Sequence, residues 1–104
     1  MSNRKPRRIL SDAELDRVAM HFRVLGETMR LKILQSVCHE ARTVNDIVAA
    51  VGATQANVSK HLALLAGAGF LTRRKSGQCV YYGMEDQFAV KMCELVHEHL
   101  VAPE

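Results

Sequence analysis

Two short helical segments on either side of a glycine constrain the fold of this chain more than any other feature. Thr43 and Thr54 belong to the residue types that cap helix N-termini, and Gly52 is suited to end the helix between them. Apolar residues follow at helical spacing: Val44, Ile47, Val48 and Val51 in the first segment, and Val58, Leu62 and Leu65 in the second. Two capped helices joined by a tight turn are typical of a helix-turn-helix, which presents its second helix to the groove of a duplex.

Three further helices are predicted around this pair. Ser11 and Glu14 have the spacing of a capping box at the start of a helix that extends to residue 25. The apolar pattern predicts a second helix over residues 28–39. A last helix, over residues 86–100, carries apolar residues at heptad-like spacing, which is typical of a helix that packs against a partner helix.

Before the last helix, the apolar spacing changes from helical to extended. Residues 71–74 and 79–82 are β-prone and flank a short polar loop, which predicts a hairpin. The predicted fold is mainly α with a small β-hairpin: a winged helix-turn-helix in the order α-α-α-α-β-β-α. We expect residues 1–10 to form a flexible basic arm, residues 11–101 the domain, and residues 102–104 a short tail.

The formal net charge of +3 is divided unevenly along the chain. Residues 85–104 hold five acidic residues and one lysine, for −4, so residues 1–84 carry +7. This basic body indicates an anionic partner, although uneven halves also arise by chance in small proteins. No apolar run approaches the roughly 20 residues of a membrane-spanning helix, and no membrane partner is expected. The three cysteines have no close spacing, which favours a cytoplasmic protein with reduced thiols over a secreted disulfide scaffold.

The second helix of the central pair presents a polar face without acidic residues, since residues 55–69 contain no Asp or Glu. Its amides can pair with adenine edges, and its small residues permit close approach to bases. Its serine, lysine and histidine suit phosphate contacts, and the helix start adds backbone donors for an anion. An ordinary solvated helix face is the alternative, but such faces mostly mix both charge signs. The candidate DNA-contacting residues of this helix are Thr54, Gln55, Ala56, Asn57, Ser59, Lys60 and His61.

The predicted hairpin adds three cations to the candidate DNA-contacting residues. Arg73, Arg74 and Lys75 lead into Gly77, so they lie close to the tip of the loop. At that position they suit contacts with phosphates or the minor groove. Taken alone, the same charges favour the interpretation as an edge strand protected from aggregation. Directly after an acid-free helix, the DNA-binding interpretation is favoured.

Three segments then carry a resemblance to a known family. Residues 26–34 (GETMRLKIL), 54–65 (TQANVSKHLALL) and 68–82 (from AGFL to GQCVYY) follow one another in order. They resemble the second helix, the recognition helix and the wing of the ArsR/SmtB family of bacterial winged-helix repressors, and the resemblance covers most of residues 12–100. It implies a homodimer built on the first and last helices, which reads an inverted repeat of operator DNA in two successive major grooves.

The resemblance also implies an inducer, because members of the family often release DNA when a metal ion or an oxidant binds. No further cofactor is required. One metal site of the family uses paired thiolates at the start of the third helix. This chain has Thr43 and Asn45 at the matching positions, so we expect that site to be absent.

A second metal site of the family lies across the two last helices of the dimer. Asp86 and His99 match two of its ligands, and their 13-residue separation of about 20 Å along one helix requires an antiparallel partner helix. Phe88 and Ala102 stand where the other two ligands are expected. His97 is two residues from His99 and faces another side of the helix. Asp86, His97 and His99 are therefore weak metal candidates, and we predict no complete zinc site.

The cysteines are the remaining candidate sensor residues. Cys79 is expected to face outward from the hairpin, near its cations, where a thiol is reactive. Cys38 follows the second helix and Cys93 lies on the last helix; for both, a small buried hydrophobic residue is the expected role. The residues do not choose among a soft metal ion, arsenite, a persulfide and an oxidant.

Two other function classes compete with a DNA-binding regulator. A winged-helix module that binds only proteins predicts an acidic or interrupted recognition face, and this chain has the opposite. An enzyme needs a converging nucleophile and base, but the histidines lie on different elements and no Gly-x-Ser-x-Gly motif occurs. We therefore expect a non-enzymatic regulator of transcription.

Overall fold

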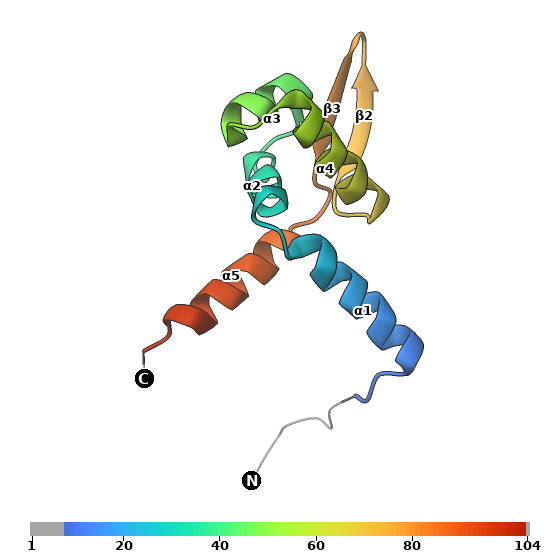
Figure 1. Cartoon of the computed structure of the whole chain (residues 1–104), viewed down its shortest axis with the longest axis vertical. Helices are drawn as coiled ribbons and strands as arrows, with labels where there is room; N and C mark the ends of the chain where they lie inside the picture. The colour runs from blue at the N-terminus through green and yellow to red at the C-terminus, as the bar shows by residue number, and fades with distance from the viewer. Residues whose placement is uncertain (1–7, 104) are drawn as a thin grey trace.

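The computed structural model describes residues 8–103, and this part of the chain contains five helices and a small antiparallel sheet (Figure 1). The elements are α1 (Asp12–Leu25), α2 (Thr28–Ser36), β1 (Arg42–Thr43), α3 (Val44–Val51), α4 (Gln55–Gly67), β2 (Thr72–Ser76), β3 (Cys79–Gly83) and α5 (Phe88–Val101). The predicted order of helices and hairpin is confirmed, and β1 is added to it. The predicted arm falls mostly on residues 1–7, which lie outside the described residues, as does residue 104.

The helix starts follow from local capping. Ser11 and Glu14 form the predicted capping box at the start of α1. The side-chain oxygens of Thr43 and Thr54 accept hydrogen bonds, both of 3.2 Å, from backbone N–H groups in the first turns of α3 and α4. Gly52 ends α3 with φ of 70°, a left-handed conformation that glycine adopts without steric cost. These caps set the turn between α3 and α4.

The end of α2 and the start of α5 differ from the prediction. α2 ends at Ser36 rather than near residue 39, because the chain turns there to bury Val37, which is 2% exposed. The Ser36 carbonyl then accepts a 2.6 Å hydrogen bond from Arg42 Nε, which holds the turn. α5 begins at Phe88 rather than residue 86, since the Asp86 carboxylate accepts a 3.0 Å hydrogen bond from the Phe88 N–H and so precedes the helix.

The sheet has the order β1-β3-β2, with both strand pairs antiparallel. In the hairpin Ser76 pairs with Cys79, so the turn is the two residues between them, and Gly77 has the positive φ, 62°, that such turns favour. β1 pairs Arg42 with Tyr82 on the other side of β3. The hairpin β2–β3, here called the wing, is therefore anchored through β3 and leaves β2 as a free edge.

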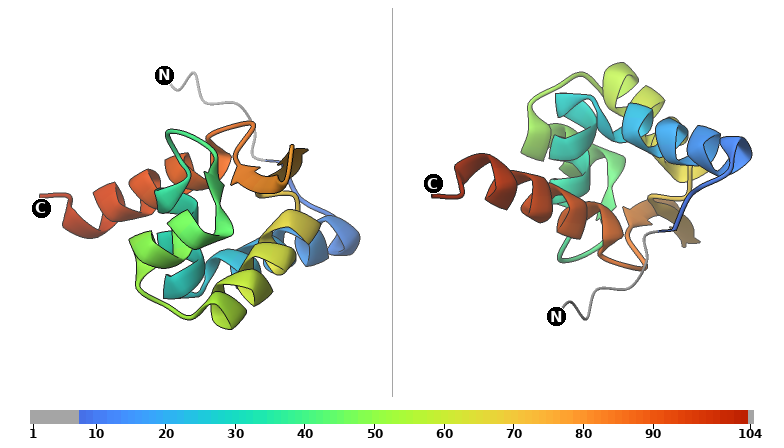
Figure 2. Two further views of the ribbon diagram at one scale, coloured as in Figure 1. Left: turned by 90° about the horizontal axis from the view of Figure 1, so that it is seen from above. Right: turned by 90° about the horizontal axis from the view of Figure 1, so that it is seen from below.

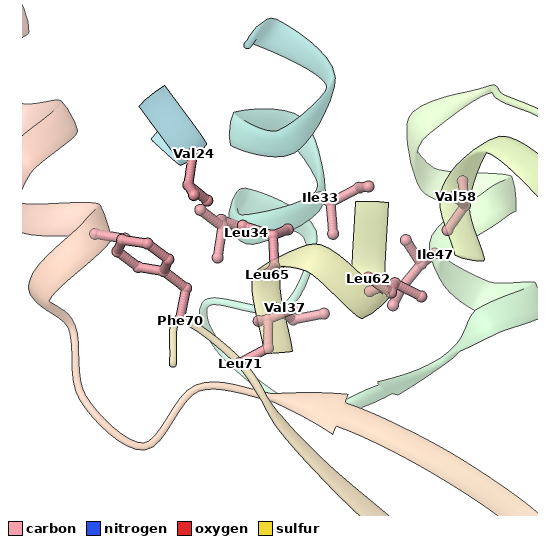
Figure 3. Close-up of a cluster of buried hydrophobic side chains, with 11 residues drawn as sticks. Val24, Ile33, Leu34, Val37, Ile47, Val58, Leu62, Leu65, Phe70 and Leu71 are labelled. Atoms are coloured by element: carbon pink, nitrogen blue, oxygen red, sulfur yellow. The ribbon is translucent and has the colours of Figure 1, made fainter. Parts of the chain in front are cut away.

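The core lies between α2, α3 and α4 (Figure 3). Its fully buried side chains each contribute about 1.5–3 kcal/mol relative to the exposed state. They are Ile33, Ile47, Val58, Leu62 and Leu65, and Val37 joins them as a sixth. No helix within residues 8–103 is long and apolar enough to cross a bilayer.

Phe70 joins the two outer helices to this body. Its ring meets His21 of α1 edge-on, at 5.1 Å between centroids, and stacks with Phe88 of α5 at 6.5 Å. Beyond these contacts α1 and α5 point away from each other, as the views from above and below show (Figure 2). Each outer helix therefore presents much of its length outside the body.

Candidate nucleic-acid interface

The exposed side of α4 carries the residues that the sequence predicts to contact DNA. The recognition surface is defined as the N-cap of α4 and the exposed residues of its first two turns: Thr54, Gln55, Ala56, Asn57, Ser59 and Lys60. All six are exposed, while the opposite side of the helix packs into the core through Val58, Leu62 and Leu65. α4 has no acidic residue in its first turn, where the free backbone N–H groups favour an anion. The surface is thus accessible, polar and free of negative charge.

His61 does not belong to this surface, which corrects the sequence prediction. Its side chain is only 7% exposed, and its Nδ1 accepts a 3.2 Å hydrogen bond from Arg30 Nε of α2. The ring therefore lies between α4 and α2 rather than toward solvent, where a phosphate would be. Glu27 and Arg30, which complete this contact, were not singled out in the sequence.

The wing carries three exposed cations, Arg73, Arg74 and Lys75, on its free edge strand β2. Arg73 pairs in register with Tyr82 and Arg74 with Tyr81, so the two guanidinium groups leave opposite faces of the strand. α4 leads into β2 through the short segment 68–71, so the wing follows the C-terminal end of α4, whereas the recognition surface lies at its N-terminal end. Both the recognition surface and the wing expose cations and contain no acidic residue.

Most of the exposed large hydrophobic residues lie elsewhere, on α1 and α5. Eleven such residues occur in the described part of the chain, and nine of them belong to these two helices. Two apolar grooves, of about 490 and 360 Å³, run along the same helices. We call the large apolar residues of α1 and α5 that line them the apolar seam: Val18, Phe22, Leu25, Phe88, Met92, Val96 and Leu100. An uncovered apolar surface of this extent is typical of a protein interface.

The candidate sensor thiols occupy two places. Cys79 is exposed at the start of β3, and its outward position agrees with the prediction. Cys38 is half-buried, and Cys93 is exposed rather than buried as expected, because this part of α5 stands away from the body. Both line one pocket of about 450 Å³ between α2 and α5. The two thiols thus share a solvent-accessible space, which their sequence separation did not indicate.

The weak metal candidates remain without a complete site in one chain. Asp86, His97 and His99 are all exposed. Within residues 8–103, no three side chains of His, Cys, Asp or Glu gather closely enough to hold a metal ion. A site that includes these residues therefore needs donors from a second chain.

Comparison with known proteins identifies the family. A model described as "Bacterial regulatory protein, arsR family" matches residues 27–73. The cadmium resistance transcriptional regulatory protein CadC homolog of Staphylococcus aureus is 32% identical over 88 residues, which cover 82% of this chain and 73% of that protein. The probable mercury resistance operon repressor of Streptomyces lividans is 35% identical over 71 residues, or 68% of this chain. The match spans only 57% of the length of that repressor.

A solved structure shares the fold at nearly full length. The homodimeric winged helix-turn-helix DNA-binding domain Mb0332 of Mycobacterium bovis superposes with a TM-score of 0.76 at 28% identity, and the match covers 94% of this chain and 97% of that one. The order of helices, the wing between α4 and α5 and the sequence similarity thus agree. The chain belongs to the ArsR family of bacterial regulatory proteins.

Proposed function

We propose that this chain is a homodimeric, DNA-binding regulator of transcription in the cytoplasm, which represses by binding operator DNA and is released by an inducer. The observation that carries the proposal is an exposed helix face without acidic residues, the recognition surface, on a chain whose wing exposes three further cations. A duplex backbone is a regular array of negative charge, so this region attracts it without local repulsion. The repressor name of the Streptomyces lividans relative supports the direction of regulation.

The recognition surface divides into residues for bases and residues for the backbone. Gln55 and Asn57, in the first turn of α4, have the amide groups that pair bidentately with adenine in the major groove. Ser59 and Lys60 follow one turn later and suit phosphates on the flank of the groove. Arg73, Arg74 and Lys75 then extend the contact along the backbone or into the adjacent minor groove.

The apolar seam supports a homodimer. Phe22 is 57% exposed, Val96 51% and Leu100 73%, so a single chain leaves large apolar side chains in water on both outer helices. A second copy that packs its own α1 and α5 against them removes this surface from water and places two α4 helices in one particle. Two recognition helices related by a two-fold axis read an inverted repeat with half-sites about one helical turn apart.

The proposed contacts are tested with duplexes that the wild-type protein selects from a randomised pool. We expect Lys60→Ala to weaken binding to all duplexes and to lower the slope of log affinity against log salt by roughly two, one phosphate per protomer. Gln55→Ala and Asn57→Ala relax base preference at one position per half-site, by about 1–3 kcal/mol. Lys91→Ala is the matched control, since Lys91 is an exposed lysine on α5. Unchanged binding by the three α4 variants would refute the proposal.

We propose further that the inducer acts through thiols or as a metal ion. Cys79 is exposed beside the cations of the wing, so its modification changes a surface that contacts DNA. Cys38 and Cys93 share the pocket between α2 and α5, so a ligand bound there acts on the helix that carries part of the apolar seam. The cadmium and mercury resistance names of the relatives are compatible with a soft-metal ligand, for which thiolates are the preferred donors.

The inducer is tested by titrating the protein–DNA complex with zinc, copper(I), arsenite, peroxide and polysulfide. Release of DNA by one of these in the wild type, and loss of that response in Cys38→Ser, Cys79→Ser or Cys93→Ser, identifies the sensing thiol. A zinc response that survives all three changes and disappears in His99→Ala assigns the metal to the ends of α5 instead. A complex that resists every reagent contradicts a thiol or metal inducer.

A further inference from the structure

A polar bridge, nearly buried at His61 and Arg30, connects α4 to the end of α1, on the side of α4 opposite the recognition surface. Its centre is Arg30 of α2, whose side chain is 17% exposed. Arg30 Nε donates to His61 Nδ1 of α4 at 3.2 Å. Arg30 Nη1 donates to the carbonyl oxygens of Arg23 and Val24, at 3.3 and 3.1 Å, in the last turn of α1. One guanidinium group therefore holds three helices together.

Glu27 completes the bridge from the N-terminus of α2. Its Oε2 lies 3.1 Å from Arg30 Nη2, and its Oε1 lies 3.5 Å from His61 Nε2. Arginine has only donors, so His61 Nδ1 must be the acceptor of the Arg30 bond, and the proton of the neutral ring is on Nε2, facing Glu27. Every nitrogen of Arg30 and both nitrogens of His61 thus have a partner. Such a satisfied, charge-assisted set has a defined geometry that a purely apolar contact lacks.

The bridge meets α1 where the apolar seam begins. Arg23 and Val24, whose carbonyls Arg30 binds, lie between Phe22 and Leu25, and both of these line the apolar grooves. At its other end His61 directly follows Lys60 of the recognition surface. The bridge therefore spans the short distance between the surface proposed for dimer contact and the helix proposed for DNA contact.

We infer that Arg30 and His61 are positioning residues for DNA binding: they fix the orientation of α4 relative to α1 and so set the separation of the two α4 helices in the dimer. The inference rests on the proposed function. Inverted-repeat recognition requires the two recognition helices to match half-sites one helical turn, or about 34 Å, apart. In a symmetric dimer any tilt of α4 against α1 occurs twice, so a small change at the bridge becomes a larger error in that separation.

The inference predicts the loss of spacing preference rather than of phosphate contacts. His61→Leu keeps the volume of the side chain but leaves Arg30 Nε without its acceptor on α4. We expect the ratio of affinities for the selected duplex and for the same duplex with one extra base pair between half-sites to fall by about tenfold, the typical cost of one lost charge-assisted hydrogen bond. The salt slope stays unchanged, because His61 contacts no phosphate.

Three further variants make the test specific. In His61→Asn the amide oxygen stands in place of Nδ1 and can accept the Arg30 bond, so the spacing ratio is retained within about twofold. Arg30→Lys keeps the positive charge but loses the guanidinium group that reaches several partners at once, so we expect it to lower the ratio of affinities. It serves as the second variant if His61→Leu does not fold. Arg42→Met is the matched control, because Arg42, like Arg30, donates to a backbone carbonyl and pairs with a glutamate, but these partners, Ser36 and Glu40, lie on neither α1 nor α4.

A ratio of affinities is independent of the fraction of folded protein, so a general loss of stability does not imitate the expected result. A wild-type ratio in both His61→Leu and Arg30→Lys overturns the inference and leaves the proposed function intact. A lower salt slope in His61→Leu with an unchanged ratio also overturns it, since that result assigns His61 to a phosphate. If the wild-type protein selects no duplex from the randomised pool, the proposed function fails, and the inference fails with it.

Discussion

Truncation of Phe22 tests whether the apolar seam is a dimer interface. Phe22 lines both apolar grooves, and the residue is 57% exposed in the single chain. Complete burial of a phenylalanine side chain contributes about 1.5–3 kcal/mol, so burial of this remaining part contributes roughly 1–1.7 kcal/mol per protomer. In a two-fold symmetric dimer the substitution occurs in both protomers, so the free energy of dimerisation changes by roughly 2–3.5 kcal/mol. We therefore expect Phe22→Ala to raise the dimer dissociation constant by roughly 30- to 300-fold.

The dissociation constant is measured by sedimentation equilibrium over a dilution series, with thermal unfolding to verify that the variant folds. Met20→Ala is the control, because Met20 is 54% exposed on the same helix but lines neither groove. We expect this change to alter the dissociation constant by less than about twofold. Equal effects of the two substitutions, or no effect of Phe22→Ala, would show that the copies associate through another surface and would refute the reasoning.

Three smaller predictions concern the turn and the wing. Thr54→Ala removes the hydrogen bond to the first turn of α4 and should lower the free energy of unfolding by about 1 kcal/mol in urea titrations, whereas Thr54→Ser should restore most of it. Gly52→Ala should cost about 1–2 kcal/mol in the same titrations, because φ is 70° and the new Cβ meets no atom within 4 Å, so the cost is purely conformational. Cys79 should react with a maleimide faster than the half-buried Cys38, as peptide mass spectrometry of briefly labelled protein can measure; equal rates would contradict the exposure of the wing thiol.

The helices were predictable from sequence because their boundaries depend on neighbouring residues. Ser11 with Glu14, Thr43 and Thr54 act on N–H groups within three residues, and Gly52 ends α3 through its own backbone conformation. The apolar spacing between these points then assigns each helix its buried side. Strand β1 lacked any such local signal. It is two residues long and exists only because β3, almost 40 residues later, offers it backbone partners.

The burial of His61 shows where residue type misled the prediction. Its polar character and its place next to Lys60 predict an exposed residue, although His61 lies three residues after Val58 and four before Leu65, on the buried stripe of the same helix. Helical spacing therefore contained the correct position. The sequence could not supply the partner that makes the burial of a polar ring tolerable, because Arg30 reaches it from another helix across 31 residues of chain.

The uneven charge of the chain has a consequence for the orientation of the proposed complex. α5 carries part of the apolar seam, and residues 85–104 around it have a charge of −4, whereas the recognition surface and the wing carry only cations. The negative charge around α5 repels a duplex that approaches this helix, and a second copy covers its apolar residues. Charge repulsion and dimer contact therefore both keep DNA away from α5. The opposite end of the domain has neither obstacle. The uneven charge of the chain thus favours DNA binding on the side of α4 and the wing. The bridge through Arg30 and His61 then fixes the orientation of α4 on that side.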